Sequence, residues 1–178
     1  MARAGRIPFS RVELALELAM VPFDEGTDGF QLPNLAVENH GFPTKLTVMY
    51  RSTTEDIQVT VEPHFLEGQT RPEEGRYVWA YTVTVENMGS ETVTLLTRHW
   101  IITDGLGRRH DVKGDGVVGE QPTLAPGQRF QYTSGCPLPT PSGLMVGSYG
   151  MLSSAGRPFD VAIPAFSLDS PHDHHSVN

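Results

Sequence analysis

The stretch Tyr77–Glu86, with the sequence YVWAYTVTVE, decides the fold of this chain. Aromatic and β-branched residues alternate in it with smaller or polar ones, which is the period of two expected of a β-strand. A turn, Asn87–Ser90 (NMGS), follows, and the apolar stretch Val93–Asp104 (VTLLTRHWIITD) then continues in extended form. Two such stretches around a short Asn/Gly turn predict an antiparallel hairpin.

The same pattern extends on both sides of this pair. Upstream, Ile57, Val59 and Val61 alternate with polar residues as far as Pro63, which predicts a strand that ends at the proline. Downstream, a Pro-Gly turn within residues 124–128 precedes further short apolar stretches. The strands predicted there are Phe130–Ser134, Leu144–Ser153, Phe159–Ile163 and Ala165–Leu168.

The number of predicted strands sets the fold class. About seven or eight short strands, joined by turns and without a helical period, indicate an all-β fold. The predicted architecture is an antiparallel two-layer β-sandwich over residues 49–171, with a closed barrel as the alternative. We expect Trp79 and Trp100 to lie in its core, because large aromatic side chains dominate the packing of such folds.

The composition excludes several classes of protein. Hydrophobic residues make up 38% of the 178 residues and charged residues 19%, which suits a folded domain with a core. No apolar stretch approaches the ~20 residues that span a bilayer. The net charge is −8 and no segment clusters Lys or Arg, so a nucleic-acid partner is not expected. The single cysteine, Cys136, fits a reducing compartment, and we expect a cytoplasmic protein.

The two ends of the chain differ from the strand-rich region. Residues 1–48 are predicted to form an N-terminal extension, and a misassigned start is an alternative explanation of it. One short helix is expected within it, over Ser10–Val21, because Ser10 and Glu13 have the spacing of a capping box. Residues 172–178 are polar and follow the last predicted strand, so we expect a flexible tail.

The tail is rich in histidine. His172, His174 and His175 are chemically suited to Co²⁺ or Ni²⁺. Adjacent ligands on a flexible segment rarely form a specific site, because ordering the segment costs entropy. Adventitious metal binding is therefore the favoured interpretation of this tail.

A glycine motif, G-x-G-x-x-G, occupies residues 114–119. In a dinucleotide-binding fold this motif precedes a helix, but here Pro122 and Pro126 follow it and no helical period is present. A glycine-rich loop can instead present backbone N–H groups to an anion, with nearby cations adding charge. The alternative is structural, with glycines at bulges and tight crossings. The candidate anion-binding residues are Gly114, Gly116, Gly119, Arg108, Arg109 and Lys113.

No catalytic residue is predicted. The motifs G-x-S-x-G and H-E-x-x-H and the Walker pattern are absent from the sequence, and Cys136 has no recognisable base motif beside it. His64, His99 and His110 lack the spacing of a zinc site. We therefore expect no enzyme and no bound cofactor, with a divalent cation left open.

The region from Met49 to Pro171 resembles the ApaG family. The blocks that carry the resemblance are YVWAYTVTVENMG, LLTRHWIITDGLGRRHDVKGDGVVGEQPTLAPGQRFQYTSG, TPSGLMVGSYGM and GRPFDVAIPAFSL. The resemblance implies an immunoglobulin-like or fibronectin type III-like β-sandwich. It also implies a link to cobalt and magnesium efflux, and related eukaryotic domains look like interaction modules. The family's glycine motif, which has prompted a suggestion of pyrophosphate binding, maps to Gly114, Gly116 and Gly119.

Three functions follow as expectations. The first is a non-enzymatic protein-interaction module associated with Co²⁺/Mg²⁺ efflux or homeostasis. The second is a protein that binds phosphate, pyrophosphate or a nucleotide through the loop 114–119. The third and weaker one is direct binding of a divalent cation, for which carboxylates suit Mg²⁺ and imidazoles Co²⁺. The sequence indicates neither the partner nor the oligomeric state.

Overall fold

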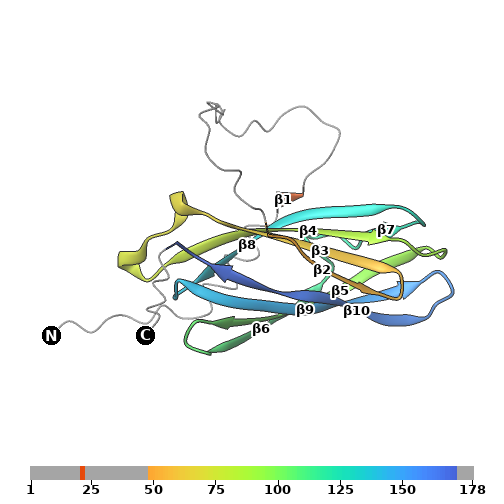
Figure 1. Ribbon diagram of the computed structural model, residues 1–178. Coiled ribbons are helices and arrows are strands. Elements are labelled where there is room, and N and C mark those ends of the chain that lie inside the picture. The colour runs from red at the N-terminus through yellow and green to blue at the C-terminus, as the bar shows by residue number, and fades with distance from the viewer. Residues whose placement is uncertain (1–20, 23–47, 172–178) are drawn as a thin grey trace, which may run out of the picture.

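Two antiparallel sheets face one another in the computed structural model, which describes residues 21–22 and 48–171 (Figure 1). The first sheet has the strand order β1-β8-β4-β3-β2 and the second the order β10-β9-β5-β6, with β7 paired to β5. The strands are β1 (Val21–Pro22), β2 (Tyr50–Thr54), β3 (Ile57–Phe65), β4 (Tyr77–Asn87), β5 (Val93–Asp104), β6 (Arg109–Asp115), β7 (Thr123–Leu124), β8 (Arg129–Leu138), β9 (Ser142–Ser153) and β10 (Pro158–Asp169).

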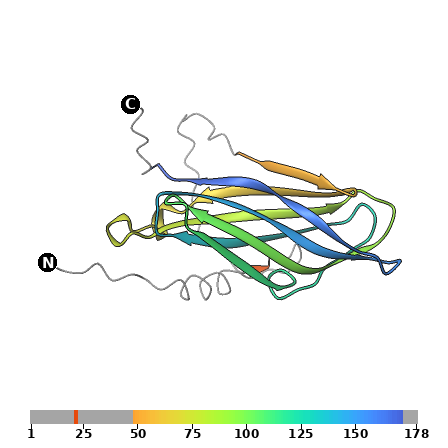
Figure 2. The same ribbon diagram turned by 90° about the horizontal axis from the view of Figure 1, so that it is seen from below.

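The predicted all-β, two-layer antiparallel β-sandwich is confirmed, and the described strands do not close into a barrel. Figure 2, seen from the side of the second sheet, shows β6, β5, β9 and β10 in front of the other layer. The only helical elements in the described ranges are two short 3₁₀ turns, η1 (Glu67–Gln69) and η2 (Pro72–Glu74). None of the helices described is long and apolar enough to span a membrane.

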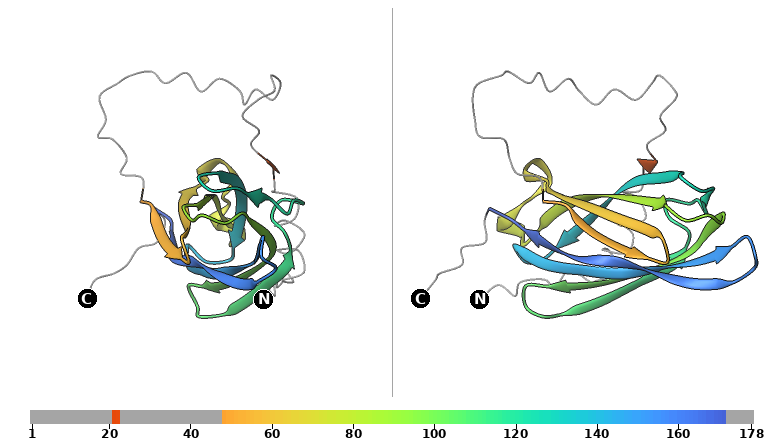
Figure 3. Two further views of the ribbon diagram at one scale, coloured as in Figure 1. Left: turned by 90° about the vertical axis from the view of Figure 1, so that its right-hand side faces the viewer. Right: turned by 45° about the vertical axis from the view of Figure 1, so that its right-hand side comes forward.

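One side of the sandwich is closed where edge strand β2 of the first sheet meets edge strand β10 of the second (Figure 3). Ser52 Oγ donates to the carbonyl oxygen of Ala162 at 2.7 Å, and the Ala162 N–H donates to Thr54 Oγ1 at 3.2 Å. Side-chain hydroxyls thus supply the hydrogen bonds that a continuous backbone ladder would otherwise make.

The predicted hairpin between the two central stretches is wrong. β4 pairs with β3 and β8, whereas β5 pairs with β6, β7 and β9 in the other sheet. Both strands turn an apolar face to the same core, so the chain crosses between the layers after β4. Buried Asn87 holds this crossing, because its Nδ2 donates to the carbonyl oxygens of Glu91 at 2.8 Å and Leu124 at 2.9 Å.

The strand predicted to end at Pro63 runs on to Phe65. β2 begins at Tyr50, which lies opposite Val61, so β3 has no neighbour on that side beyond Val61 among the residues described. A proline there removes no ladder hydrogen bond, which is why an edge position tolerates it.

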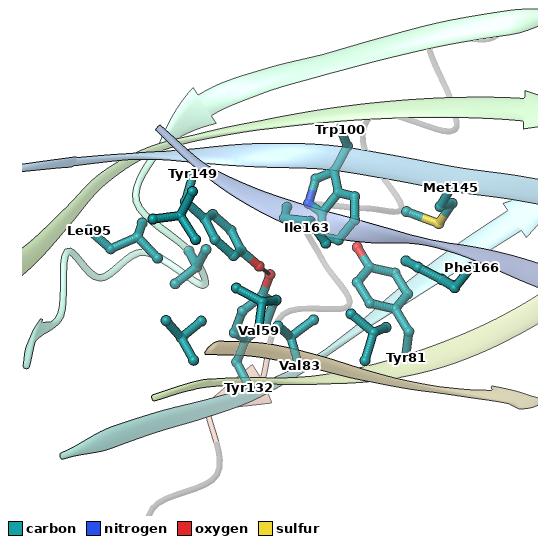
Figure 4. Packing of buried hydrophobic residues seen from close by; sticks show 14 of the residues in the cluster. Val59, Tyr81, Val83, Leu95, Trp100, Tyr132, Met145, Tyr149, Ile163 and Phe166 are labelled. Atoms are coloured by element: carbon teal, nitrogen blue, oxygen red, sulfur yellow. Dashed lines mark hydrogen bonds between the residues drawn. The ribbon is translucent and has the colours of Figure 1, made fainter. Parts of the chain in front are cut away.

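The core is built around Trp100, of which 2% is exposed (Figure 4). Its ring centroid lies 5.4 Å from that of Tyr81 in the first sheet and 6.0 Å from that of Phe166 on β10. Both pairs have the edge-to-face geometry that aromatic rings favour. Trp79 is also buried, so the predicted placement of both tryptophans is confirmed.

The ends of the chain lie largely outside the described residues. This applies to the helix predicted over residues 10–21, apart from Val21, which belongs to strand β1 and pairs with Thr133 of β8. It also applies to His172, His174 and His175 of the predicted tail.

Candidate functional site

The glycine motif lies where β6 leaves the second sheet. Gly116 has a φ of +56°, and its N–H donates to the carbonyl oxygen of Leu96 at 2.7 Å. Val117 and Glu120 then exchange two backbone hydrogen bonds of 2.8 Å across a two-residue turn. Val118 and Gly119 at its centre have φ angles of +47° and +77°, which is the type I′ geometry. The motif therefore forms a tight β-turn.

Arg98 fixes this loop from the neighbouring strand. It lies two residues before Trp100 on β5, so its side chain starts on the inward face of the sheet. One terminal guanidinium nitrogen, Nη1, donates to the carbonyl oxygens of Asp115 and Gly116, both at 2.9 Å. A Cβ atom on Gly114 would lie 3.0 Å from the same nitrogen. Gly114 therefore leaves the space that the guanidinium occupies.

The structure separates the six candidate anion-binding residues. Arg108 and Arg109 lie at the start of β6 and the glycine turn follows its end, and seven extended residues span roughly 20 Å. Arg108 Nε donates to Asp104 Oδ2 at 2.6 Å, and Arg109 Nε donates to Asp111 Oδ1 at 2.7 Å. Among these cations Lys113 lies nearest in sequence to the turn. Both arginines are thus engaged with carboxylates away from the loop.

An exposed ion cluster lies on the outer face of β5 and β6. His99 Nε2 lies 3.2 Å from Asp111 Oδ2, and Arg109 approaches the same carboxylate from within its own strand. Hydrogen bonds from the Arg109 guanidinium, followed by that from His99, hold the pKa of Asp111 well below its usual range. No group of three His, Cys, Asp or Glu side chains in the described ranges is arranged to hold a metal ion.

The titratable groups of the core are kept neutral by burial. Cys136 is 0% exposed, and burial raises the pKa of its thiol to about 12, so the nucleophilic thiolate is absent at neutral pH. Tyr132 and Tyr149 join their hydroxyl groups across the two sheets in a hydrogen bond of 2.5 Å (Figure 4). Burial raises the pKa of both phenols, and that of Tyr81.

These four buried groups predict a loss of stability in alkali. In the unfolded chain Cys136 releases its proton near about pH 8.5 and the tyrosines near about pH 10, whereas the folded chain retains all four protons. The stabilising effect is complete below about pH 8.5 and declines as the pH rises. Urea unfolding should therefore show a falling free energy between about pH 9 and 11. A Cys136→Ala variant lacks the contribution of the thiol, so its free energy of unfolding should begin to fall only at about pH 10, where the tyrosines of the unfolded chain ionise. A free energy of unfolding that does not change with pH in the unmodified protein would contradict the argument.

Sequence reasoning missed a second exposed feature, the leucine at the tip of the turn between β5 and β6. Leu106 at its tip is 73% exposed, which is the largest exposed fraction among the large apolar residues described. Arg108 and Arg109 follow it at the start of β6 and are also exposed. The signal for the turn, Asp-Gly-Leu-Gly at residues 104–107, is present in the sequence.

A buried carboxylate holds this turn in place. The Asp104 side chain is 1% exposed, and its Oδ1 accepts the N–H groups of Leu106 at 3.0 Å and Arg108 at 2.9 Å. The Gly105 N–H donates to Thr140 Oγ1 at 2.9 Å, which ties the turn to the connection between β8 and β9. Hydrogen bonds from Asp104 and Thr140 therefore hold the backbone around Leu106 in place.

Comparison with known proteins matches most of this chain to members of one family. Residues 67–153 match the ApaG domain family, also designated DUF525. Protein ApaG of Rhodospirillum centenum is 61% identical over 130 residues, which is 73% of this chain and all of that protein. Protein ApaG of a Bradyrhizobium species (strain BTAi1) is 61% identical over 123 residues, which is 69% of this chain and 94% of that protein.

Solved structures support the same relationship. The crystal structure of an ApaA protein from Bordetella pertussis superposes with a TM-score of 0.64 and 50% sequence identity, covering 66% of this chain and 95% of that one. The proteins named ApaG carry no enzyme designation in their names. On the sequence identity and the shared β-sandwich, this chain belongs to the ApaG family.

Proposed function

We propose that this protein is a non-enzymatic protein-interaction module of the cytoplasm, and that any role in Co²⁺/Mg²⁺ efflux or homeostasis is exerted through its partner. The observation that carries the proposal is the exposure of Leu106 on a turn that buried Asp104 holds rigid. An exposed leucine on a fixed backbone loses little conformational entropy when it is buried by a partner.

The chemistry around Leu106 agrees with a docking role. Arg108 keeps half of its side chain exposed while its Nε is bound to Asp104. Arginine is enriched in the few interface residues that supply most of the binding energy, and apolar neighbours exclude water around it. The turn therefore offers one apolar and one cationic contact side by side.

The proposal predicts a loss of partner binding in Leu106→Ser. The tagged full-length protein would be used to recover partners from its native cytosol, which are then identified and quantified by mass spectrometry. Leu106→Ser should recover at least about tenfold less of the same partner, because burying a leucine side chain contributes about 1.5–3 kcal/mol. Its folding stability should change by no more than about 0.5 kcal/mol, since the side chain is exposed.

Met88→Ser is the matched control for this experiment. Met88 is 49% exposed and lies in the connection that follows β4. Its replacement by serine therefore also removes an exposed apolar side chain, but at another place on the surface. It should recover the partner as the unmodified protein does. Equal recovery by both variants and the unmodified protein, or no reproducible partner, would contradict the proposal.

A further inference from the structure

A cavity of about 350 Å³ opens where the ends of β3 and β10 approach the starts of β2 and β4. Tyr50, Phe65 and Trp79 supply aromatic side chains to its lining. The rings of Phe65 and Trp79 pack edge to face with their centroids 5.4 Å apart. Pro63 and Pro171 add further apolar surface, so much of the wall is rigid and hydrophobic.

One carboxylate of the lining is held in place by a directed chain of hydrogen bonds. Ser167 Oγ donates to Asp169 Oδ2 at 2.6 Å, so the hydroxyl of Tyr50, 2.8 Å from Ser167 Oγ, must be the donor in the next bond. The Trp79 indole N–H also donates to the backbone carbonyl of Asp169 at 3.2 Å. Three lining residues thus fix the position of Asp169 while its side chain remains exposed.

Two acidic side chains line the cavity. Asp169 and Glu67 both line it, and no described residue forms an ion pair with Asp169. Among the described residues of the lining, His64 is the only basic one. An aromatic wall beside a carboxylate suits an organic cation with an apolar stem, because the stem packs on the rings and the cation meets the carboxylate and the π faces.

We propose that this cavity binds an arginine or lysine side chain of a protein partner. The assignment rests on the proposed interaction function and adds a second contact with a defined chemistry. A bare divalent cation fits less well, because the described carboxylates and imidazoles do not form a metal-binding group and three aromatic rings offer it no ligand.

The two indole N–H groups provide the test. The ¹⁵N-labelled full-length protein would be titrated with three capped tripeptides, glycyl-arginyl-glycine, glycyl-lysyl-glycine and glycyl-norleucyl-glycine. A basic peptide should shift the Trp79 indole resonance saturably, with a half-point on the order of 1 mM for a single side chain. The Trp100 resonance should stay in place, because Trp100 is not among the residues that line the cavity.

Two variants decide whether the carboxylate is responsible. Asp169→Asn keeps an acceptor for Ser167 but removes the charge, and it should weaken binding of the basic peptide at least fivefold. Asp160→Asn, at another exposed position of β10, is the matched control and should leave binding unchanged.

Three results would overturn the inference. They are an unmoved Trp79 resonance with both basic peptides, an equal shift with the norleucine peptide, and unchanged affinity in Asp169→Asn. None of them bears on the Leu106 turn, whose partner recovery tests the proposed function separately.

Discussion

Replacing Trp100 by alanine is expected to lower the free energy of unfolding by about 3–5 kcal/mol. Its ring contacts aromatic side chains of both sheets, with Tyr81 on one side and Tyr149 and Phe166 on the other. The cavity left by its removal has few ways to collapse, because its walls are strands fixed by hydrogen bonds to their neighbours. Urea unfolding followed by circular dichroism would measure the loss.

Trp100→Phe and Leu106→Ala are the controls for this prediction. Phenylalanine retains one ring in the aromatic cluster and should lose less than alanine does. Leu106→Ala removes a large apolar side chain that is exposed, so its effect should remain within about 0.5 kcal/mol. A loss below about 1 kcal/mol in Trp100→Ala would mean that the two layers do not depend on this packing.

The layers of the fold were predictable from the sequence because alternation reports burial on one face. Trp79, Tyr81, Val83 and Val85 are all buried, as their period of two in the sequence predicts. Alternation does not report which strand lies beside which. The turn after β4 therefore predicted a hairpin between β4 and β5. In the structure the chain crosses to the other layer there, and hydrogen bonds from Asn87 hold the crossing.

Two edge strands gave no sequence signal for a physical reason. β2 (YRSTT) has no buried residue, and β6 (RHDVKGD) buries only Val112, because each has a neighbour on one side alone. The cavity lined by Asp169 was unpredictable in a different way. It joins residues more than a hundred positions apart, such as Tyr50 and Ser167, and only the fold brings these together.

The exposed leucine of the turn at residues 104–107 could have been singled out from the sequence. Its Asp-Gly-Leu-Gly sequence, with an apolar residue between two glycines, is an unusual choice for a loop that merely connects two strands. The sequence could not show that the carboxylate of Asp104 is buried and accepts hydrogen bonds from the backbone N–H groups of Leu106 and Arg108. That contact distinguishes a presented leucine from one on an unconstrained loop.

Gly116→Ala is expected to destabilise the protein by about 2–5 kcal/mol. Residue 116 has a φ of +56°, which costs an L-residue about 1–2 kcal/mol, and a Cβ there would lie 2.0 Å from the carbonyl oxygen of Glu120. The backbone must shift to relieve this overlap, which adds about 1–3 kcal/mol. Thermal or urea unfolding measures the sum.

Gly119→Ala separates these two contributions. Its φ is +77°, but nothing lies within 4 Å of the Cβ position, so only the cost of about 1–2 kcal/mol for the backbone conformation applies. If both variants lost equal stability, the close approach to Glu120 would not be the reason for glycine at position 116. If Gly116→Ala lost clearly more stability than Gly119→Ala, the close backbone approach in the tight turn would explain the glycine at position 116.

The same pair of positions tests the pyrophosphate alternative. The N–H groups of Gly116, Val117 and Glu120 already donate to backbone carbonyls, and Asp115 and Glu120 add negative charge beside the loop. Calorimetry of the unmodified protein with millimolar pyrophosphate should therefore give no saturable heat. Gly119→Ala, which should stay folded, is the variant to use if heat is seen, because Gly116→Ala could lose binding by unfolding. Saturable binding that Gly119→Ala abolishes would show that the turn holds an anion despite its occupied donors.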